Sequence, residues 1–285
     1  MQRRLAALTA AVLLPVAALT ACSSSSDEPA PAQRSALPAR VLESGTLKVG
    51  TEAQFAPMVF TNPENQLTGF DIDLMTAIGE ALDVKVDFQQ APFADLLPGV
   101  VGTEYDVAVR GIFDTLRRQE QVDMVTYYSA GTQWAERTGD NIDPTDACGK
   151  RVAAERGTTQ FTSELPAKSD ACTDVGEEAI EVVGFDSLRD ALTALANGAV
   201  DAVSADSPVI LYAAKESAGR LQAIGNPFDT QPYGIAVAKG SPLGPVLRQV
   251  VQQLIDDGKL KQIGEKWGLD DDGQITTSQL NGATS

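Results

Sequence analysis

The stretch Tyr105-Asp-Val-Ala-Val-Arg110-Gly-Ile-Phe-Asp-Thr-Leu-Arg-Arg118 joins a short apolar segment to a polar turn and the start of a helix. Residues 105–109 are typical of a buried strand, and Asp114 or Thr115 offers an N-cap for a short helix through Gln121. A strand, a polar loop and then a helix is the repeating unit of α/β folds. The stretch therefore predicts an α/β protein.

Strands and helices alternate in both directions from this stretch. We expect further strands at 46–50, 84–88, 151–155, 181–183 and 199–204, and helices at 71–82, at 93–101, after Gly157, from about 186 to 198 and from 241 through 255. Such alternation predicts mostly parallel sheets with helices on both faces. One block precedes Gln133 and another follows Lys150, which indicates two lobes.

Composition limits the function. The chain has 285 residues, a formal charge of −17 and no histidine. The charge argues against nucleic acid, since Lys and Arg on phosphates drive that binding. Lack of histidine removes the commonest general base and metal ligand, so we expect neither a metal site nor a cofactor.

The N-terminus carries export signals. Arg3 and Arg4 precede an apolar run, residues 5–19, and small residues follow, as in a secretory signal. Leu19-Thr-Ala-Cys22 resembles a bacterial lipobox, which implies a signal peptide over 1–22 and a lipid on Cys22. An ordinary signal with an incidental cysteine, or a short membrane anchor, stays open, although the run falls short of the roughly 20 residues of a spanning helix.

Residues 23–40 are rich in Ser, Pro and Ala and predict a flexible tether. The protein would then sit on the outer face of the cell membrane. In that oxidising compartment Cys148 and Cys172 form an even pair, so we expect a disulfide between them, two free thiols being the alternative. The acidic and polar residues 269–285 predict a loosely held tail.

Polar segments follow the expected strands. In open α/β sheets a ligand binds at the carboxyl ends of the strands, beside helix N-termini. This rule points to the segments 51–57, 69–74, 110–118, 157–160 and 204–206.

In this order and spacing, the five segments resemble family 3 extracellular solute-binding proteins, the polar amino-acid receptors of ABC importers, from about Leu42 to Gly268. The resemblance implies a monomer with the two-lobed periplasmic-binding-protein-like fold of type II. Lobe 1 would contain 41–133 plus 228–268, and lobe 2 would contain 134–227. The two-segment hinge would cross near 132–136 and 225–229 before the chain returns through 233–238.

The resemblance also implies a site for a free amino acid. Arg118 would bind the ligand carboxylate with its planar fork, and Asp206 would pair with the ligand ammonium. Thr159 would close lobe 2 onto the carboxylate. Backbone amides near Gly111 and Thr115 would add donors. Taken singly, such residues are more often a solvated charge, a helix cap or a turn.

Five further residues would face the ligand side chain: Glu52, Phe55, Phe93, Arg110 and Glu155. The two Phe rings would sandwich its aliphatic part or else belong to the core. Two carboxylates favour a basic amino acid or glutamine over an acidic one. Arg110 argues the other way, unless it is already paired with one of them. Phe113 departs from the family's usual Ser or Thr.

Two other functions stay open. The same domain could serve as a ligand sensor that signals through a membrane partner instead of feeding a permease. A few proteins of this fold act as cyclohexadienyl dehydratases, and Glu52 or Glu155 could supply their general acid. An exported location and the pair Arg118 and Asp206 favour binding over catalysis, so we expect no enzyme.

Overall fold

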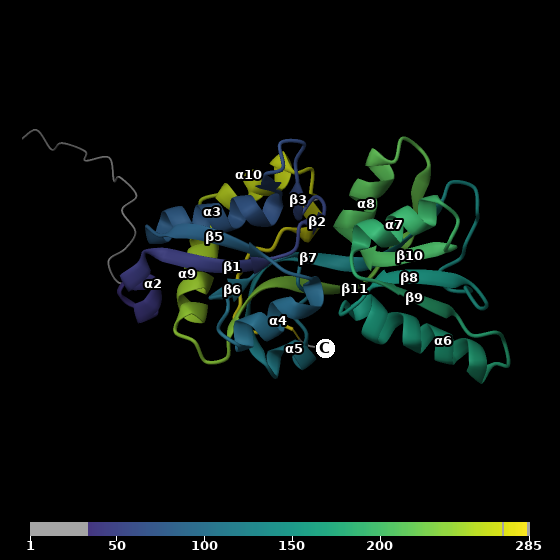
Figure 1. Cartoon of the computed structure of the whole chain (residues 1–285), viewed down its shortest axis with the longest axis horizontal. Coiled ribbons are helices and arrows are strands. Elements are labelled where there is room, and N and C mark those ends of the chain that lie inside the picture. Colours follow the sequence, from purple (N-terminus) through teal and green to yellow (C-terminus); the bar gives the residue numbers. More distant parts are fainter. Residues whose placement is uncertain (1–33, 270, 284–285) are drawn as a thin grey trace, which may run out of the picture.

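The computed structural model describes residues 34–269 and 271–283, and it has two α/β lobes joined by a pair of long strands (Figure 1). The predicted signal, Cys22 and residues 23–33 lie outside the described residues. Within the described part, no helix is both long and apolar enough to cross a membrane.

Lobe 1 is built on parallel strands. β1 (Thr46–Thr51) pairs in parallel with β5 (Lys85–Gln90) and with β6 (Val107–Ala108). The C-terminal part of β11 (Leu221–Ala238) pairs with β6, and the N-terminal part of β7 (Val122–Arg137) pairs with β11. Both pairings are antiparallel and extend this sheet. Its helices are α2 (Ala39–Ser44), α3 (Phe70–Leu82), α4 (Phe93–Val101), α5 (Leu116–Gln119), α9 (Leu243–Asp256) and α10 (Lys259–Lys266).

A small antiparallel sheet and a short turn complete lobe 1. The sheet contains β2 (Gln54–Phe55), β3 (Val59–Thr61) and β4 (Leu67–Thr68), and η2 (Asp271–Gly273) is a 3₁₀ turn. The chain enters β2 directly after β1, so the carboxyl end of β1 lies beside this sheet.

Lobe 2 repeats the arrangement. β8 (Arg151–Glu155) pairs in parallel with β9 (Glu181–Phe185) and β10 (Ala202–Asp206), and β10 pairs with β7. Its helices are η1 (Gln160–Glu164, a π-helical turn), α6 (Leu165–Asp174), α7 (Leu188–Ala196) and α8 (Ser207–Glu216). The predicted fold class, α/β lobes with mostly parallel pairing, is confirmed.

The hinge differs in detail from the prediction. β7 and β11 run as one antiparallel pair through both lobes, with register shifts between Ile224 and Phe228 and again up to Gln231. Residues 132–136 pair with β10, so the stretch predicted as the first crossing already belongs to the sheet of lobe 2. β7 is buried almost throughout its length, and such an uninterrupted run carries no local signal of where one lobe ends.

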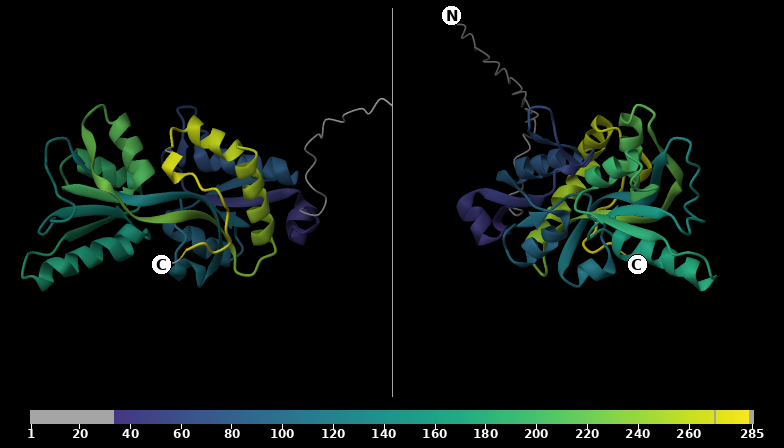
Figure 2. Two further views of the ribbon diagram at one scale, coloured as in Figure 1. Left: turned by 180° about the vertical axis from the view of Figure 1, so that it is seen from behind. Right: turned by 45° about the vertical axis from the view of Figure 1, so that its right-hand side comes forward.

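The prediction of a loose C-terminal tail is wrong for residues 274–283. The Ser278 hydroxyl donates to the Thr126 carbonyl at 2.7 Å, and the Asn281 N–H donates to the Met124 carbonyl at 2.7 Å. Leu280 forms a bridge with Val125. The first half of β7 is the edge of the lobe 1 sheet, and the tail satisfies its backbone groups. Figure 2 shows this segment, in yellow, along the back of the molecule.

The predicted tether is too long at its C-terminal end. Leu37 and Val41 are buried in the core of lobe 1, and α2 begins at Ala39. An apolar residue inside a polar segment gains about 1.5–3 kcal/mol from burial, which favours docking over a free chain. The folded part therefore includes residues 34–40.

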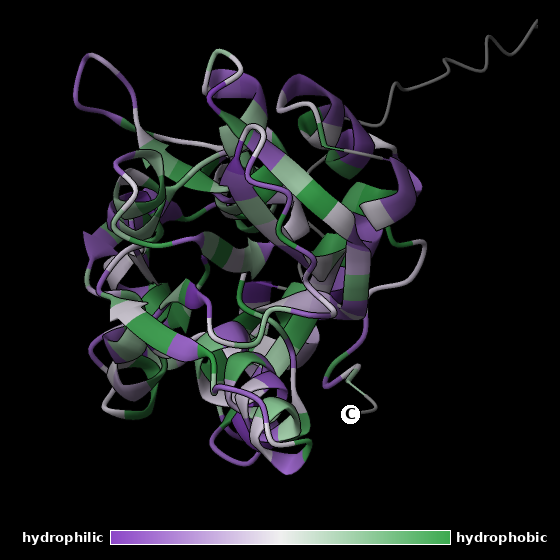
Figure 3. Cartoon of the chain, turned by 90° about the vertical axis from the view of Figure 1, so that its right-hand side faces the viewer, coloured by the Kyte–Doolittle hydropathy of each residue, from purple (hydrophilic) through white to green (hydrophobic). Residues whose placement is uncertain are grey.

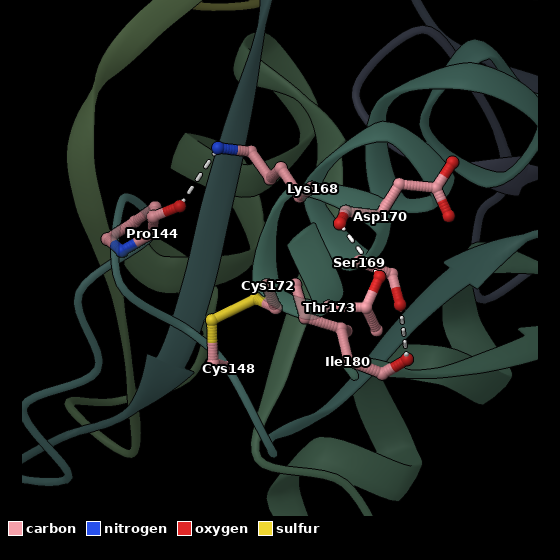
Figure 4. Close-up of a disulfide and its surroundings, with 8 residues drawn as sticks. All are labelled: Pro144, Cys148, Lys168, Ser169, Asp170, Cys172, Thr173 and Ile180. Carbon is pink, nitrogen blue, oxygen red and sulfur yellow. Dashed lines mark hydrogen bonds between the residues drawn. A yellow bond between two sulfur atoms is a disulfide. The ribbon is translucent and has the colours of Figure 1, made fainter. Parts of the chain in front are cut away.

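The predicted disulfide is confirmed. Cys148, in the loop before β8, is bonded to Cys172 of α6 (Figure 4). Lys168 of the same helix donates to the Pro144 carbonyl at 2.9 Å, and the Ser169 hydroxyl donates to the Ile180 carbonyl at 3.2 Å. Helix α6 is thus fixed to the loop before β8 and to the segment before β9.

The core follows the sheets. Valine, leucine and alanine side chains of the central strands are fully buried, and Trp134 forms a separate cluster with lobe 2 residues. Seen along the long axis with lobe 2 towards the viewer, hydrophilic colour gathers in the outer loops and hydrophobic colour along strands and one side of the helices (Figure 3). Polar side chains that are buried inside the lobes, away from these loops, are therefore exceptions to this pattern.

Candidate functional site

A cleft of about 740 Å³ opens between the lobes. Lobe 1 lines it with Phe93, Thr115 and Arg118, and lobe 2 lines it with Gly157 and Thr159. Four of the predicted ligand residues therefore face one cavity. The Thr159 hydroxyl is half-buried and donates to the Gln160 side chain at 3.3 Å.

Arg118 crosses this cleft. Thr115 caps α5 by accepting the N–H of Arg118 at 3.2 Å, and this turn fixes the start of the side chain. The guanidinium donates to the Phe113 carbonyl at 2.7 Å and to the Gly157 carbonyl of lobe 2 at 3.2 Å. Burial lowers the pKa of Arg118 to about 10, so the side chain is a cation at neutral pH. These two carbonyl oxygens accept from guanidinium N–H groups that would bind a ligand carboxylate more strongly.

Asp206 lies at the end of β10, in lobe 2, and is buried. Its carboxylate accepts hydrogen bonds from Gln160 Nε2 at 2.8 Å and from the Tyr233 hydroxyl at 2.7 Å. Burial raises its pKa to about 6, against the opposing effect of Tyr233 and Arg110. No role is predicted from the sequence for Gln160 or Tyr233, although they lie in the predicted segments 157–160 and 233–238.

Arg110 lies behind the cleft and is 1% exposed. Its Nε and Nη2 both donate to Glu52 Oε2 at 3.0 Å, and Nη2 also donates to Glu155 of lobe 2. The guanidinium carbon lies 3.6 Å from the Phe55 ring centre and 4.4 Å from the Phe93 ring centre. We call the four residues around it, Glu52, Phe55, Phe93 and Glu155, the guanidinium box.

In the guanidinium box two carboxyl groups face the single cation of Arg110. Burial alone would lower the pKa of Arg110, but Glu155 and Glu52 hold it above its usual value. Burial raises the pKa of Glu155 to about 7, although Arg110 opposes the rise. Glu155 Oε1 is buried and has no hydrogen-bond partner among the described residues. One guanidinium therefore serves two carboxylates and leaves an acceptor unused.

The backbone N–H of Gly111 is not available to a ligand, contrary to the prediction. Its N–H donates to Asp71 Oδ2 at 2.8 Å and to the Tyr127 hydroxyl at 3.2 Å, so this donor is used inside lobe 1. Gly111 has φ of +56°, and a Cβ there would come within 2.9 Å of the Phe55 ring. The glycine is needed for the turn that lets Phe55 approach.

Phe113 belongs to the core of lobe 1. Its side chain is 3% exposed and its ring centre lies 5.1 Å from that of Tyr233. Phe113 therefore offers no hydroxyl to the site, and the Tyr233 hydroxyl next to this ring donates to Asp206. An aromatic pair thus fills the space beside the site.

Two α/β lobes on a paired-strand hinge, with polar groups from both lobes at the cleft, define a class of two-lobed ligand-binding proteins. Residues 47–270 match the family model of bacterial extracellular solute-binding proteins, family 3. The chain belongs to this family.

Named relatives agree with this assignment. The arginine-binding protein ArgT of Corynebacterium glutamicum is 32% identical over 260 residues, which is 89% of this chain and 86% of the relative. The structure of an ancestral arginine-binding protein bound to arginine has a TM-score of 0.72 and 36% identity, covering 78% of this chain and 98% of that one. An ancestral amino acid-binding protein, named as a precursor of cyclohexadienyl dehydratase, has a TM-score of 0.70 and 29% identity, covering 80% and 97%.

Proposed function

We propose that this chain is an extracytoplasmic receptor that captures a polar amino acid between its lobes and delivers it to an ABC permease. The observation that carries the proposal is the placement of opposite charges on opposite lobes. The Arg118 guanidinium of lobe 1 lines the cleft, and the Asp206 carboxylate of lobe 2, buried on Gln160 and Tyr233, lies within electrostatic reach of it. A free amino acid carries a carboxylate and an ammonium. It would satisfy both groups when the lobes close over it.

Charge favours a basic ligand or glutamine over an acidic one. Glu52, Glu155 and Asp206 face the two guanidinium groups of Arg110 and Arg118, so carboxylates outnumber cations. An acidic side chain would add to this excess, whereas a basic one would relieve it. The names of the Corynebacterium relative and of the ancestral structure, both arginine-binding, support the same preference.

Binding is favoured over catalysis. The dehydratase alternative needs a free general acid, and Glu52 and Glu155 both accept hydrogen bonds from Arg110. Neither lines the open cleft. We therefore propose a receptor and not an enzyme, even though one solved neighbour is named as a precursor of a dehydratase.

We also propose that a lipid on Cys22 anchors the mature protein to the outer face of the cell membrane as a monomer. The basic head, apolar run and Leu-Thr-Ala-Cys ending support it. Metabolic labelling with a palmitate analogue tests the anchor. Label in the wild type and none in Cys22→Ser is expected, and equal labelling would overturn it.

Thermal unfolding against a panel of amino acids and cyclic acids tests the receptor. A ligand at roughly 100 times its dissociation constant adds about 2.7 kcal/mol of stability. We expect arginine, lysine or glutamine to raise the melting temperature, Arg118→Ala to lose the shift, and the control Arg189→Ala, on the exposed face of α7, to keep it. Shifts only with glutamate or aspartate would overturn the preference, and shifts only with cyclic acids would favour the dehydratase.

A further inference from the structure

The guanidinium box is a complete recognition site that is already filled. Two aromatic rings, whose centres lie 3.6 and 4.4 Å from the guanidinium carbon, and two carboxylates that accept its hydrogen bonds supply the contacts that this cation uses. The occupant is Arg110, a side chain of the same chain. The open cleft accordingly begins at Phe93 and does not reach Glu52, Phe55 or Glu155.

The filled box spans the two lobes. Glu52, Phe55, Phe93 and Arg110 belong to lobe 1, and Glu155 ends β8 of lobe 2. The contact between Arg110 and Glu155 therefore forms only while the lobes are close together. Arg118 makes a second contact across the cleft, to the Gly157 carbonyl, two residues after Glu155.

The box also has unused capacity. Glu155 Oε1 is buried without a hydrogen-bond partner among the residues described. A buried acceptor without a partner destabilises the protein, so a further donor would be stabilised there. Phe93 lines the cleft and also contacts Arg110, so this ring separates the open cleft from the filled box.

We propose that Arg110 is a built-in competitor that determines specificity: its tethered guanidinium fills the subsite for a cationic side chain, and a basic ligand enters that subsite only by displacing it. An uncharged side chain such as that of glutamine binds with Arg110 in place and donates to Glu155. This inference rests on the proposed function for its ligands, but the occupancy of the box is tested without them.

The first test is chemical rescue with the guanidinium ion. The mature chain carrying Arg110→Ala is heated with guanidinium chloride at low millimolar concentrations, with sodium chloride at equal ionic strength as reference. We expect a saturable rise in melting temperature for Arg110→Ala, none for the wild type, and none for Arg110→Ala combined with Glu52→Gln and Glu155→Gln. No rise in folded Arg110→Ala would overturn the proposal.

Arg110→Ala leaves two buried carboxylates without their cation, and the variant can fail to fold. In that case Arg110→Ala with Glu155→Gln carries the same test, since Glu52 and the two rings remain. A saturable guanidinium effect in this variant supports the box, and its absence in folded protein overturns it.

The second test compares arginine and glutamine by calorimetric titration. We expect Arg110→Ala to bind arginine more tightly relative to glutamine than the wild type does, by about tenfold or more in the ratio of their dissociation constants. Arg110→Lys, which keeps the charge but not the planar fork, should shift it less. An unchanged ratio would overturn the proposal. If no amino acid binds the wild type while guanidinium rescues Arg110→Ala, the proposed function fails and the occupied box stands.

Discussion

The hydroxyl of Tyr233, in the lobe 1 half of β11, donates to Asp206 Oδ2 at 2.7 Å across the junction of the two lobes. Both side chains are buried. This bond connects the hinge strand β11 to the carboxylate that we assign to the ligand ammonium. A movement of the hinge that breaks the bond would therefore also change the pKa of Asp206.

Tyr233→Phe tests this link. The change removes one of the two donors to Asp206, which raises the pKa of that carboxyl further and costs about 1–3 kcal/mol of stability. Amino-acid affinity at neutral pH should fall, measured by calorimetric titration. Tyr212→Phe, on α8, is the matched control and should keep its affinity. Equal affinities for Tyr233→Phe and wild type would contradict the assigned role.

The ligand-free protein should lose stability as pH rises from about 4 to 8. Burial raises the pKa of Asp71 to about 7, of Glu155 to about 7 and of Asp206 to about 6. In this window the native state binds more protons than the unfolded state, so the free energy of unfolding falls with pH. Urea unfolding at several pH values measures it.

Whether this trend holds between about pH 4 and 8 depends on which neighbouring groups titrate in that range. Around Asp206, Arg110, Arg118 and Tyr233 keep their protons over this range, and Gln160 does not titrate. Glu155, which interacts with Asp206, titrates inside the window in the same direction. Asp201 acts in the opposite sense: its pKa is lowered from 3.8, so its contribution is present over the window and is lost as the pH falls from the window's lower edge. Asp71→Asn should flatten the profile, and a stability that rises steadily to pH 8 would contradict the account.

The C-terminal strap, residues 278–283, should support both stability and binding. The N–H groups of Gly282 and Ala283 donate to Asp114 Oδ2 at 2.7 and 3.1 Å, directly before the turn that carries Arg118. Ending the chain at Thr277 removes several bonds worth about 0.5–1.5 kcal/mol each. We expect a lower urea midpoint and weaker ligand binding. An unchanged midpoint would show that the strap contributes nothing.

The disulfide should stabilise lobe 2. Cys148 and Cys172 are 24 residues apart, and a loop of that length corresponds to about 3 kcal/mol in the chain-entropy model. Cys148→Ser with Cys172→Ser should therefore lower the melting temperature. Dithiothreitol should lower the wild type to the same value and leave the double variant unchanged. A reductant effect on the double variant would indicate another cause.

Much of the architecture could be predicted because periodicity is local. Helix 71–82 appears as α3 (Phe70–Leu82), and Thr115 does cap α5. The hinge and the tail could not be predicted, since both depend on partners far along the chain. Ser278 and Asn281 are polar, and only the edge of β7 explains why they are ordered.

Part of the candidate site could also be predicted from the sequence, and part could not. Strand-end reasoning and family resemblance pointed to Arg118, Asp206 and the five residues of the side-chain pocket. The structure places Arg118 and Phe93 on the cleft and packs Glu52, Phe55 and Glu155 around Arg110, away from its lining. Asp206 is buried on Gln160 and Tyr233 and does not line the cleft either. The sequence could not show that Arg110 pairs with both Glu52 and Glu155, because that contact needs two lobes in place. Gln160 and Tyr233 were missed, since neither residue type carries a charge that signals a partner.

The most direct test is calorimetric titration of the mature wild-type protein and of Arg118→Ala with arginine, lysine, glutamine and glutamate at neutral pH. The account predicts one-site binding of a basic amino acid or glutamine to the wild type, and its loss in Arg118→Ala. Binding of glutamate alone, or binding that Arg118→Ala leaves unchanged, would contradict it.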